Sequence, residues 1–222
     1  MRGVRQIYAI VHRDLLLELR AREHVAGMAV LALLALMVFN FAFDLTGADR
    51  AASGAGALWV AIVFAGLLGM GRLAAIDRQQ GAWEGLLLAP VDRGTIFLGK
   101  LGSALLFIGI VEMVTLLAFA ALFSLPVFQP AVLLVVGLGT VGFCTLGTLF
   151  SVMAATTRAR EVLLPVLLLP LALPVVISAV RATALLLADR AVEAGPWMSL
   201  LLGFDLLFLG LGYVVFGLAV EE

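Results

Sequence analysis

Residues 101–123 read Leu-Gly-Ser-Ala-Leu-Leu-Phe-Ile-Gly-Ile-Val-Glu-Met-Val-Thr-Leu-Leu-Ala-Phe-Ala-Ala-Leu-Phe. Apolar side chains fill most of this run, and Glu112 is its single charged residue. A helix that crosses the hydrocarbon core of a membrane needs about 20 mainly apolar residues, because each residue adds about 1.5 Å to its length. A spanning strand would instead alternate apolar and polar side chains. The run therefore predicts a transmembrane helix.

Five further runs have the same character, and the composition of the whole chain agrees with them. Of the 222 residues, 64% are hydrophobic and 13% are charged, and the mean hydropathy is +1.17. A water-soluble domain is about half apolar and a quarter charged, so lipid must be the solvent for much of this chain. We expect an all-α membrane protein with six transmembrane helices in a single domain, residues 1–222. The other five runs are 25–43, 55–71, 131–153, 162–180 and 197–220.

Positive charges beside the runs predict how the helices are oriented. Short cytoplasmic loops of membrane proteins are enriched in Lys and Arg. The loops on one side of the predicted bundle hold only Arg50, Arg181 and Arg190. We therefore expect a multi-pass protein of a bacterial cytoplasmic (inner) membrane with both termini in the cytoplasm. The basic residues on the side of the termini are Arg2, Arg5, Arg13, Arg20, Arg22, Arg72, Arg78, Arg93, Lys100, Arg158 and Arg160.

The N-terminal segment, residues 2–24, has the pattern of an amphipathic helix at the membrane surface. One face carries apolar residues and the opposite face carries arginines. Two interpretations are open: an elbow that packs along the bundle, or a basic anchor without a further role. The apolar face is formed by Ile7, Val11, Leu15 and Leu19, and the arginines are Arg2, Arg13 and Arg20.

Residues 77–100 form the longest polar segment and lie on the predicted cytoplasmic side. Their pattern predicts a short helix with Trp83, Leu86 and Leu87 on one face and Asp77, Gln80 and Glu84 on another. Pro90 ends this helix, because proline has no N–H to donate. Such an apolar face suits a groove on another protein. Composition alone favours a second interpretation, in which the face dips into the lipid interface.

Glycines form two patterns that resemble nucleotide-binding loops. Residues 94–100 nearly match G-x-x-x-x-G-K-[ST], but Leu101 stands where the hydroxyl is required, and residues 137–142 match G-x-G-x-x-G inside an apolar run. Neither has the strand that such loops need, so we interpret the second as helix packing, since small residues let membrane helices approach closely. Spacing predicts packing roles, within the chain or between copies, for Gly137, Gly139, Gly142, Gly147, Gly203, Gly210 and Gly217.

Two acidic residues, Glu112 and Asp205, lie inside predicted membrane helices. Ionisable groups there are costly and are functional candidates by default. A proton or cation path could use both, but the favoured interpretation is a carboxyl group satisfied within the bundle. Trp59 and Trp197 fall where an outer aromatic belt is expected. His12 and His24 have no cluster of metal ligands around them, and the net charge of −1 without a basic block argues against a nucleic-acid partner.

The fifth predicted helix contains three prolines, Pro165, Pro170 and Pro174. Each removes a backbone hydrogen bond of the helix, so the freed carbonyls need other partners. The helix is a candidate hinge or re-entrant bend in a transport path, and the alternative is a static kink.

Taken together, these features resemble the membrane subunit of a type-2 ABC exporter. In that family the loop after the second span reads acidic-x-x-x-Gly-[Thr/Ser]-Leu-Glu-x-Leu-Leu-x-x-Pro and ends at a Lys, and Ala82 and Trp83 depart from it here. The resemblance is closer to the cytochrome c maturation protein B (CcmB) family, in the loop at residues 84–90, the glycine-rich run 137–147 and the proline-paired run 169–177. The residues that match the loop are Asp77, Gly81, Trp83, Glu84, Leu86, Leu87, Pro90 and Lys100.

The resemblance implies a non-enzymatic subunit driven by partners. In the CcmB family the loop after the second span couples to a separate ATPase, CcmA, which binds the ATP. The family forms a homodimer with two CcmA copies, and works with CcmC and CcmD to release the heme-loaded chaperone CcmE for cytochrome c assembly. No cofactor is expected on this chain itself, because heme is handled by the complex. The mechanical hypothesis is that closure of the ATPase dimer pushes on residues 83–87 and that the proline-rich helix switches between two arrangements.

Two other functions fit the sequence. The first is a type-2 exporter permease for lipid, drug or polysaccharide, which gene neighbours would distinguish. The second is a self-contained proton-coupled carrier that uses Glu112 and Asp205, for which inverted repeats would be the supporting sign. A membrane enzyme is the weakest reading, for want of a catalytic constellation.

Overall fold

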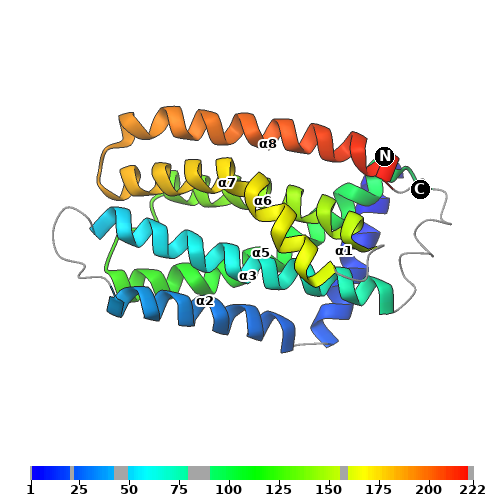
Figure 1. Ribbon diagram of the computed structural model, residues 1–222, viewed down its shortest axis with the longest axis horizontal. Helices are drawn as coiled ribbons and strands as arrows, with labels where there is room; N and C mark the ends of the chain where they lie inside the picture. The colour runs from blue at the N-terminus through cyan, green and yellow to red at the C-terminus, as the bar shows by residue number, and fades with distance from the viewer. Residues whose placement is uncertain (1, 21–22, 43–49, 80–90, 156–159, 220–222) are drawn as a thin grey trace.

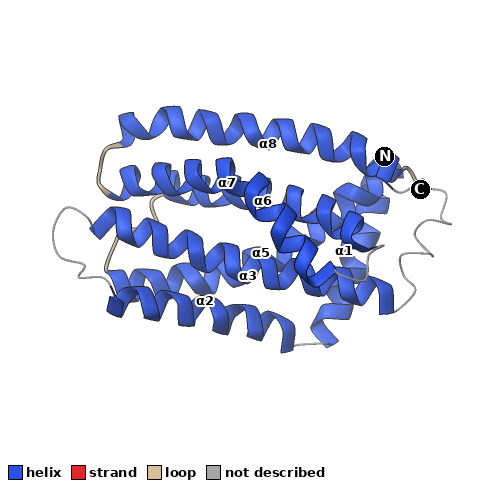
Figure 2. Ribbon diagram, viewed as in Figure 1, coloured by secondary structure: helices blue, strands red, loops and turns tan. Residues whose placement is uncertain are grey.

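Helices account for almost the whole of the computed structural model, which describes residues 2–20, 23–42, 50–79, 91–155 and 160–219. Within these ranges there is no strand (Figure 2). Six of the helices are long and apolar enough to cross a membrane. The prediction of an all-α protein with six membrane helices is therefore confirmed. The helices are α1 (Arg2–Arg20), α2 (Glu23–Ala42), α3 (Arg50–Gln79), α5 (Arg93–Phe123), α6 (Pro130–Ala155), α7 (Arg160–Leu187) and α8 (Ala191–Ala219).

The six long helices run side by side along the long axis of the molecule, and α1 lies across them at one end (Figure 1). The first residues of α1 and the last residues of α8 are at this end, which we call the α1 end. The crossing direction follows from the sequence of α1, because a helix with a polar and an apolar side is most stable along a surface where both are satisfied.

Several membrane helices extend beyond the predicted runs. α5 begins at Arg93 instead of Leu101, α7 ends at Leu187 instead of Val180, and α3 covers Arg50–Gln79 instead of 55–71. The predicted runs ended beside the charged residues Lys100, Arg181 and Arg72, and the helices continue past them. For α5 the extension also has a cap, because the side chain of Asp92 accepts a hydrogen bond from the Thr95 backbone N–H at 3.3 Å.

α6 is the central helix of the bundle. It packs against α3, α5, α7 and α8, and it is buried along most of its length. Its small residues make this possible, because glycines let bulky side chains of neighbouring helices reach its backbone. A Cβ atom at Gly139 would lie 2.1 Å from Cη2 of Trp59, and one at Gly147 would lie 2.8 Å from Cε of Met70.

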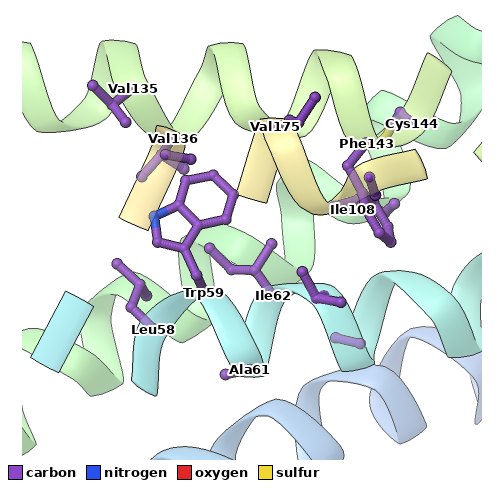
Figure 3. Packing of buried hydrophobic residues seen from close by; sticks show 14 of the residues in the cluster. Leu58, Trp59, Ala61, Ile62, Ile108, Val135, Val136, Phe143, Cys144 and Val175 are labelled. Carbon is purple, nitrogen blue, oxygen red and sulfur yellow. The ribbon is translucent and has the colours of Figure 1, made fainter. Parts of the chain in front are cut away.

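Trp59 corrects one expectation from the sequence. Its side chain is 1% exposed, and Figure 3 shows the indole pointing from α3 into the bundle near Val136. The indole Nε1 donates a hydrogen bond to Thr183 Oγ1 at 3.0 Å, which joins α3 to α7. Trp59 is thus an internal packing residue and not part of a lipid-facing aromatic belt. The reason is Gly139, which leaves the space that the large ring fills.

At the end opposite α1, polar side chains complete the last turn of α5. Asn40 Nδ2 donates to the Leu122 carbonyl at 3.0 Å, and the guanidinium of Arg50 donates to the Phe123 carbonyl. The last carbonyls of a helix have no partner within it, so these contacts satisfy groups that would otherwise be unpaired. Ser124 follows in the left-handed conformation and ends the helix.

Candidate functional site

The first turns of α5 form a junction with two other helices at the α1 end. This position matters because the polar segment 77–100 ends within the first turns of α5, which begins at Arg93. α3, the helix before that segment, also runs toward the α1 end (Figure 1). Within α5 the junction covers residues 92–103, and it brings together contacts from α1 and from α8.

The α1 side of the junction is centred on Asp14, whose side chain is 6% exposed. One carboxylate oxygen accepts hydrogen bonds from Lys100 Nζ at 3.0 Å and from Ser103 Oγ at 2.9 Å. The other accepts two hydrogen bonds from the guanidinium of Arg13, at 2.8 and 3.1 Å. A buried carboxylate with this many donors is well satisfied, and its charge is matched by two cations.

Apolar packing surrounds this polar contact. Ile10, 7% exposed, lies on Gly99, where a Cβ atom would approach its side chain to 2.9 Å. Val11 lies beside Gly102, where a Cβ atom would approach the Val11 side chain to 3.1 Å. The two glycines let the backbone of α5 come close enough to α1 for Asp14 to reach Lys100. α1 is therefore joined to α5 by a polar contact inside an apolar frame.

The α8 side of the junction is an exchange of aromatic rings and glycines, which we call the α5–α8 interlock. The ring of Tyr213 from α8 lies against Gly94 of α5, where a Cβ atom would approach it to 2.2 Å. The ring of Phe97 from α5 lies against Gly212 of α8, where a Cβ atom would approach the ring to 2.6 Å. Phe97 also contacts Phe216, with ring centroids 5.4 Å apart.

A hydrogen bond completes the interlock. The hydroxyl of Tyr213 donates to Asp92 Oδ2 at 3.2 Å. Asp92 is also the N-cap of α5, so the same carboxylate holds the first turn of α5 and the end of α8. A residue of the polar segment is thereby connected to a second membrane helix.

Most of the residues predicted to couple to the ATPase lie outside the described residues. Asp77 is within α3, and the short helix predicted from the pattern of Trp83, Leu86 and Leu87 also falls outside the description. Lys100, the last residue of the predicted coupling loop, lies inside α5 and contacts Asp14. The undescribed members of the predicted segment are Gly81, Trp83, Glu84, Leu86, Leu87 and Pro90.

The two membrane carboxyl groups lie on different sides of the central helix. Glu112 of α5, 7% exposed, accepts a hydrogen bond from Thr140 Oγ1 of α6. Asp205 of α8, 2% exposed, lies beside Gly142 of α6, and neither of its oxygens has a hydrogen-bond partner in the described part of the chain. The structure thus places each group against α6 and does not bring the two together. A charged, unpartnered carboxylate at such a site is unfavourable, which favours the neutral acid for Asp205.

The predicted packing glycines fall into two groups. Gly139, Gly142 and Gly147 of α6 have side chains of other helices within contact distance of an added Cβ atom. Gly137 of α6 and Gly203 and Gly210 of α8 face open space in the single chain. Gly217 lies in α8, but its surroundings are outside the description.

The three prolines lie between the second turn and the middle of α7, which remains one helix from Arg160 to Leu187. Its ribbon changes direction along its length (Figure 1). Pro170 is exposed, Pro174 is partly buried, and the Pro174 carbonyl accepts a hydrogen bond from Ser178 Oγ at 2.7 Å. The surroundings of Pro165 lie outside the description. α7 packs against α3, α6 and α8.

Sequence reasoning singled out Lys100 but missed its partner Asp14 and the α8 residue Tyr213. Asp14 interrupts the apolar and basic pattern of α1, and an acidic residue directly beside an arginine was the available signal. Tyr213 carried no signal of its own, since a tyrosine near a helix end is common at membrane surfaces. In the described residues there is no group of three or more His, Cys, Asp or Glu side chains that could hold a metal ion.

Comparison with known proteins adds to this geometry. The sequence profile of the family described as "CcmB protein" matches residues 5–222. Heme exporter protein B of Rhodobacter capsulatus is 28% identical over 172 residues, which are 76% of this chain and 78% of that protein. Heme exporter protein B of Pseudomonas aeruginosa is 32% identical over 123 residues, 55% of each chain. No solved structure shows a significant match.

Proposed function

The chain belongs to the CcmB family, and from this we propose that it is the membrane subunit of an ABC-type complex that handles heme in cytochrome c biogenesis. In this proposal a separate ATPase subunit hydrolyses ATP, and this multi-pass membrane subunit converts the ATPase motion into delivery of heme or release of a heme-loaded chaperone. The match along almost the whole chain is the observation that carries the proposal.

The proposed orientation places the α1 end in the cytoplasm. Positive residues flank the helices at that end, whereas the basic residues near the opposite end are Arg50, the first residue of α3, Arg181, in the last turns of α7, and Arg190, between α7 and α8. A bacterial inner membrane is the location that fits an ATP-driven partner on one side and cytochrome c assembly on the other. Both chain termini are cytoplasmic in this arrangement.

The proposed partners follow the CcmB family. They are a CcmA-like ATPase, CcmC-like and CcmD-like membrane subunits, a CcmE-like heme chaperone that acts indirectly, and a second copy of this chain. The exposed glycines Gly203 and Gly210 on α8 offer a face on which a second copy could pack closely. Lipid surrounds the remaining apolar surface, and heme is cargo of the complex.

The junction supports a mechanical role for the polar segment. The segment, residues 77–100, begins in the last turns of α3 and ends in the first turns of α5. Those first turns are fixed to α1 through Asp14 and to α8 through Tyr213. A push on the segment by an ATPase would therefore act on several helices at once. The proline-rich α7 remains a proposed hinge, reached through its contacts with α3, α6 and α8.

The proposal is tested by a triple substitution in the segment, Trp83→Ala with Leu86→Ala and Leu87→Ala. We expect the variant to reach the membrane, to lose co-purification with the ATPase and to stop formation of holocytochrome c, because the apolar face for the partner is gone. A matched control removes one aromatic and two leucine side chains that are exposed on α2, with Phe41→Ala, Leu31→Ala and Leu34→Ala, and should leave both measurements unchanged. Full ATPase binding together with normal holocytochrome c in the first variant would refute the proposal.

A further inference from the structure

The α5–α8 interlock has the geometry of a rigid connection. Each helix supplies a glycine that receives a ring of the other, so Tyr213 rests on Gly94 while Phe97 rests on Gly212. Because each ring lies directly on the backbone of the other helix, no further side chain separates the two helices at these contacts. Close packing of this kind resists sliding, because any shift along the helix axis would move a ring onto a neighbouring Cβ atom.

The interlock lies at the start of α5, where the polar segment 77–100 enters the helix. Asp92, the acceptor of the Tyr213 hydroxyl, is the residue just before α5, and the polar segment leads directly into it. α8 follows from the interlock toward the bundle centre, where Asp205 lies against Gly142 of α6. A displacement of the first turn of α5 would thus be carried into α8 and from there to the central helix.

We propose that Tyr213 is a positioning residue that makes α5 and α8 move as one unit, so that α8 carries the motion of the coupling segment into the bundle. The proposal rests on the proposed function and adds the helix through which the motion passes. It differs from the sequence-based hypothesis, in which the proline-rich helix α7 was the best candidate. In the structure α8 has a direct contact with the start of α5 through named side chains.

The first experiment separates the ring of Tyr213 from its hydroxyl. Tyr213→Ala removes both, and Tyr213→Phe keeps the ring on Gly94. In membranes that contain the whole complex, we expect Tyr213→Ala to keep ATPase co-purification and ATP hydrolysis while holocytochrome c per ATP hydrolysed falls about tenfold, a usual size for loss of a contact on a coupling route. Tyr213→Phe should restore most of the yield, because ring packing supplies the rigidity.

The two outcomes that concern the partner are distinct. Loss of ATPase binding in the Trp83, Leu86 and Leu87 variant tests the proposed function, whereas Tyr213→Ala acts after the ATPase has bound. Normal holocytochrome c per ATP in Tyr213→Ala would overturn the positioning role and leave the proposed function standing. Loss of ATPase binding in Tyr213→Ala would also overturn it, since the residue would then serve docking.

A cross-linking experiment covers the case in which Tyr213→Ala does not accumulate. Phe97→Cys and Gly212→Cys, the other ring and glycine of the interlock, are combined with Cys144→Ser, which removes the native thiol. Tyr213 stays on Gly94 in this variant, and a short bifunctional thiosulfonate joins the two cysteines. If α5 and α8 move as one unit, the cross-linked complex should remain as active as the same variant before cross-linking. Inactivation by the cross-link, with the uncross-linked variant active, would show that the two helices must separate and would overturn the proposal. The same cross-linking on the pair Gly142→Cys and Asp205→Cys shows how activity changes when α6 is joined to α8. This change is compared with the one that follows from joining α5 to α8.

Discussion

The carboxylate of Asp14 accepts a hydrogen bond from Lys100 at 3.0 Å, although the two residues lie far apart in the sequence. This contact fixes the amphipathic helix α1 on the first turns of α5. It gives α1 a specific place on the bundle and supports the elbow interpretation over a simple basic anchor. Whatever moves the start of α5 must therefore also move α1, or break this contact.

Replacing Asp14 with alanine should loosen α1. Lys100 and Ser103 would lose a buried acceptor, so we expect the free energy of unfolding to fall by about 2 kcal/mol. Thermal unfolding of the purified protein in detergent measures the change, and limited proteolysis shows whether α1 becomes accessible. Arg5→Ala, at an exposed position of the same helix, should change neither. Equal stability of Asp14→Ala and the unaltered protein would mean that the contact contributes nothing to the fold.

Gly139 and Gly137 provide a matched pair on the central helix. An alanine at 139 would meet the Trp59 ring, so Gly139→Ala should destabilise the protein by about 1–3 kcal/mol, the range for an overpacked core. An alanine at 137 meets nothing, and Gly137→Ala should leave stability unchanged or slightly raised, since alanine favours helix. Thermal unfolding in detergent compares the two. Similar melting temperatures for both variants would contradict the packing of Trp59 on Gly139.

Asp205→Asn distinguishes a structural acid from a proton carrier. Asparagine has the shape of the neutral acid, so under the proposed function we expect holocytochrome c formation within about twofold of the unaltered protein. Glu112→Gln is the companion variant and should behave alike, because its amide carbonyl can still accept from Thr140. The measurement is holocytochrome c yield at equal amounts of membrane-inserted protein. Loss of function in both variants, with the complex intact, would favour the proton-coupled carrier.

The sequence predicted the class of fold well because each membrane helix carries its own signal. Twenty apolar residues in a row require a helix in lipid whatever the rest of the chain does. The ends of the helices were less predictable, as α5 shows, since the turns from Arg93 to Lys100 contain two charged residues and are stabilised by a cap and by other helices. The candidate site was predicted only in part. Composition pointed to residues 77–100, but not to Asp14 or Tyr213, whose roles depend on which helices are neighbours.

By itself the sequence determined that this chain is a six-helix membrane protein, and its motifs pointed to the CcmB family, which comparison confirmed. The tertiary structure decided what the sequence left open. It made α6 the central helix, moved Trp59 from an expected lipid belt to the core, and joined the start of α5 to α1 and α8. The physical reason is the difference between the two kinds of information. Hydrophobicity acts on each segment alone, whereas the fit of a ring on a glycine or of a lysine on an aspartate exists only when two distant segments meet.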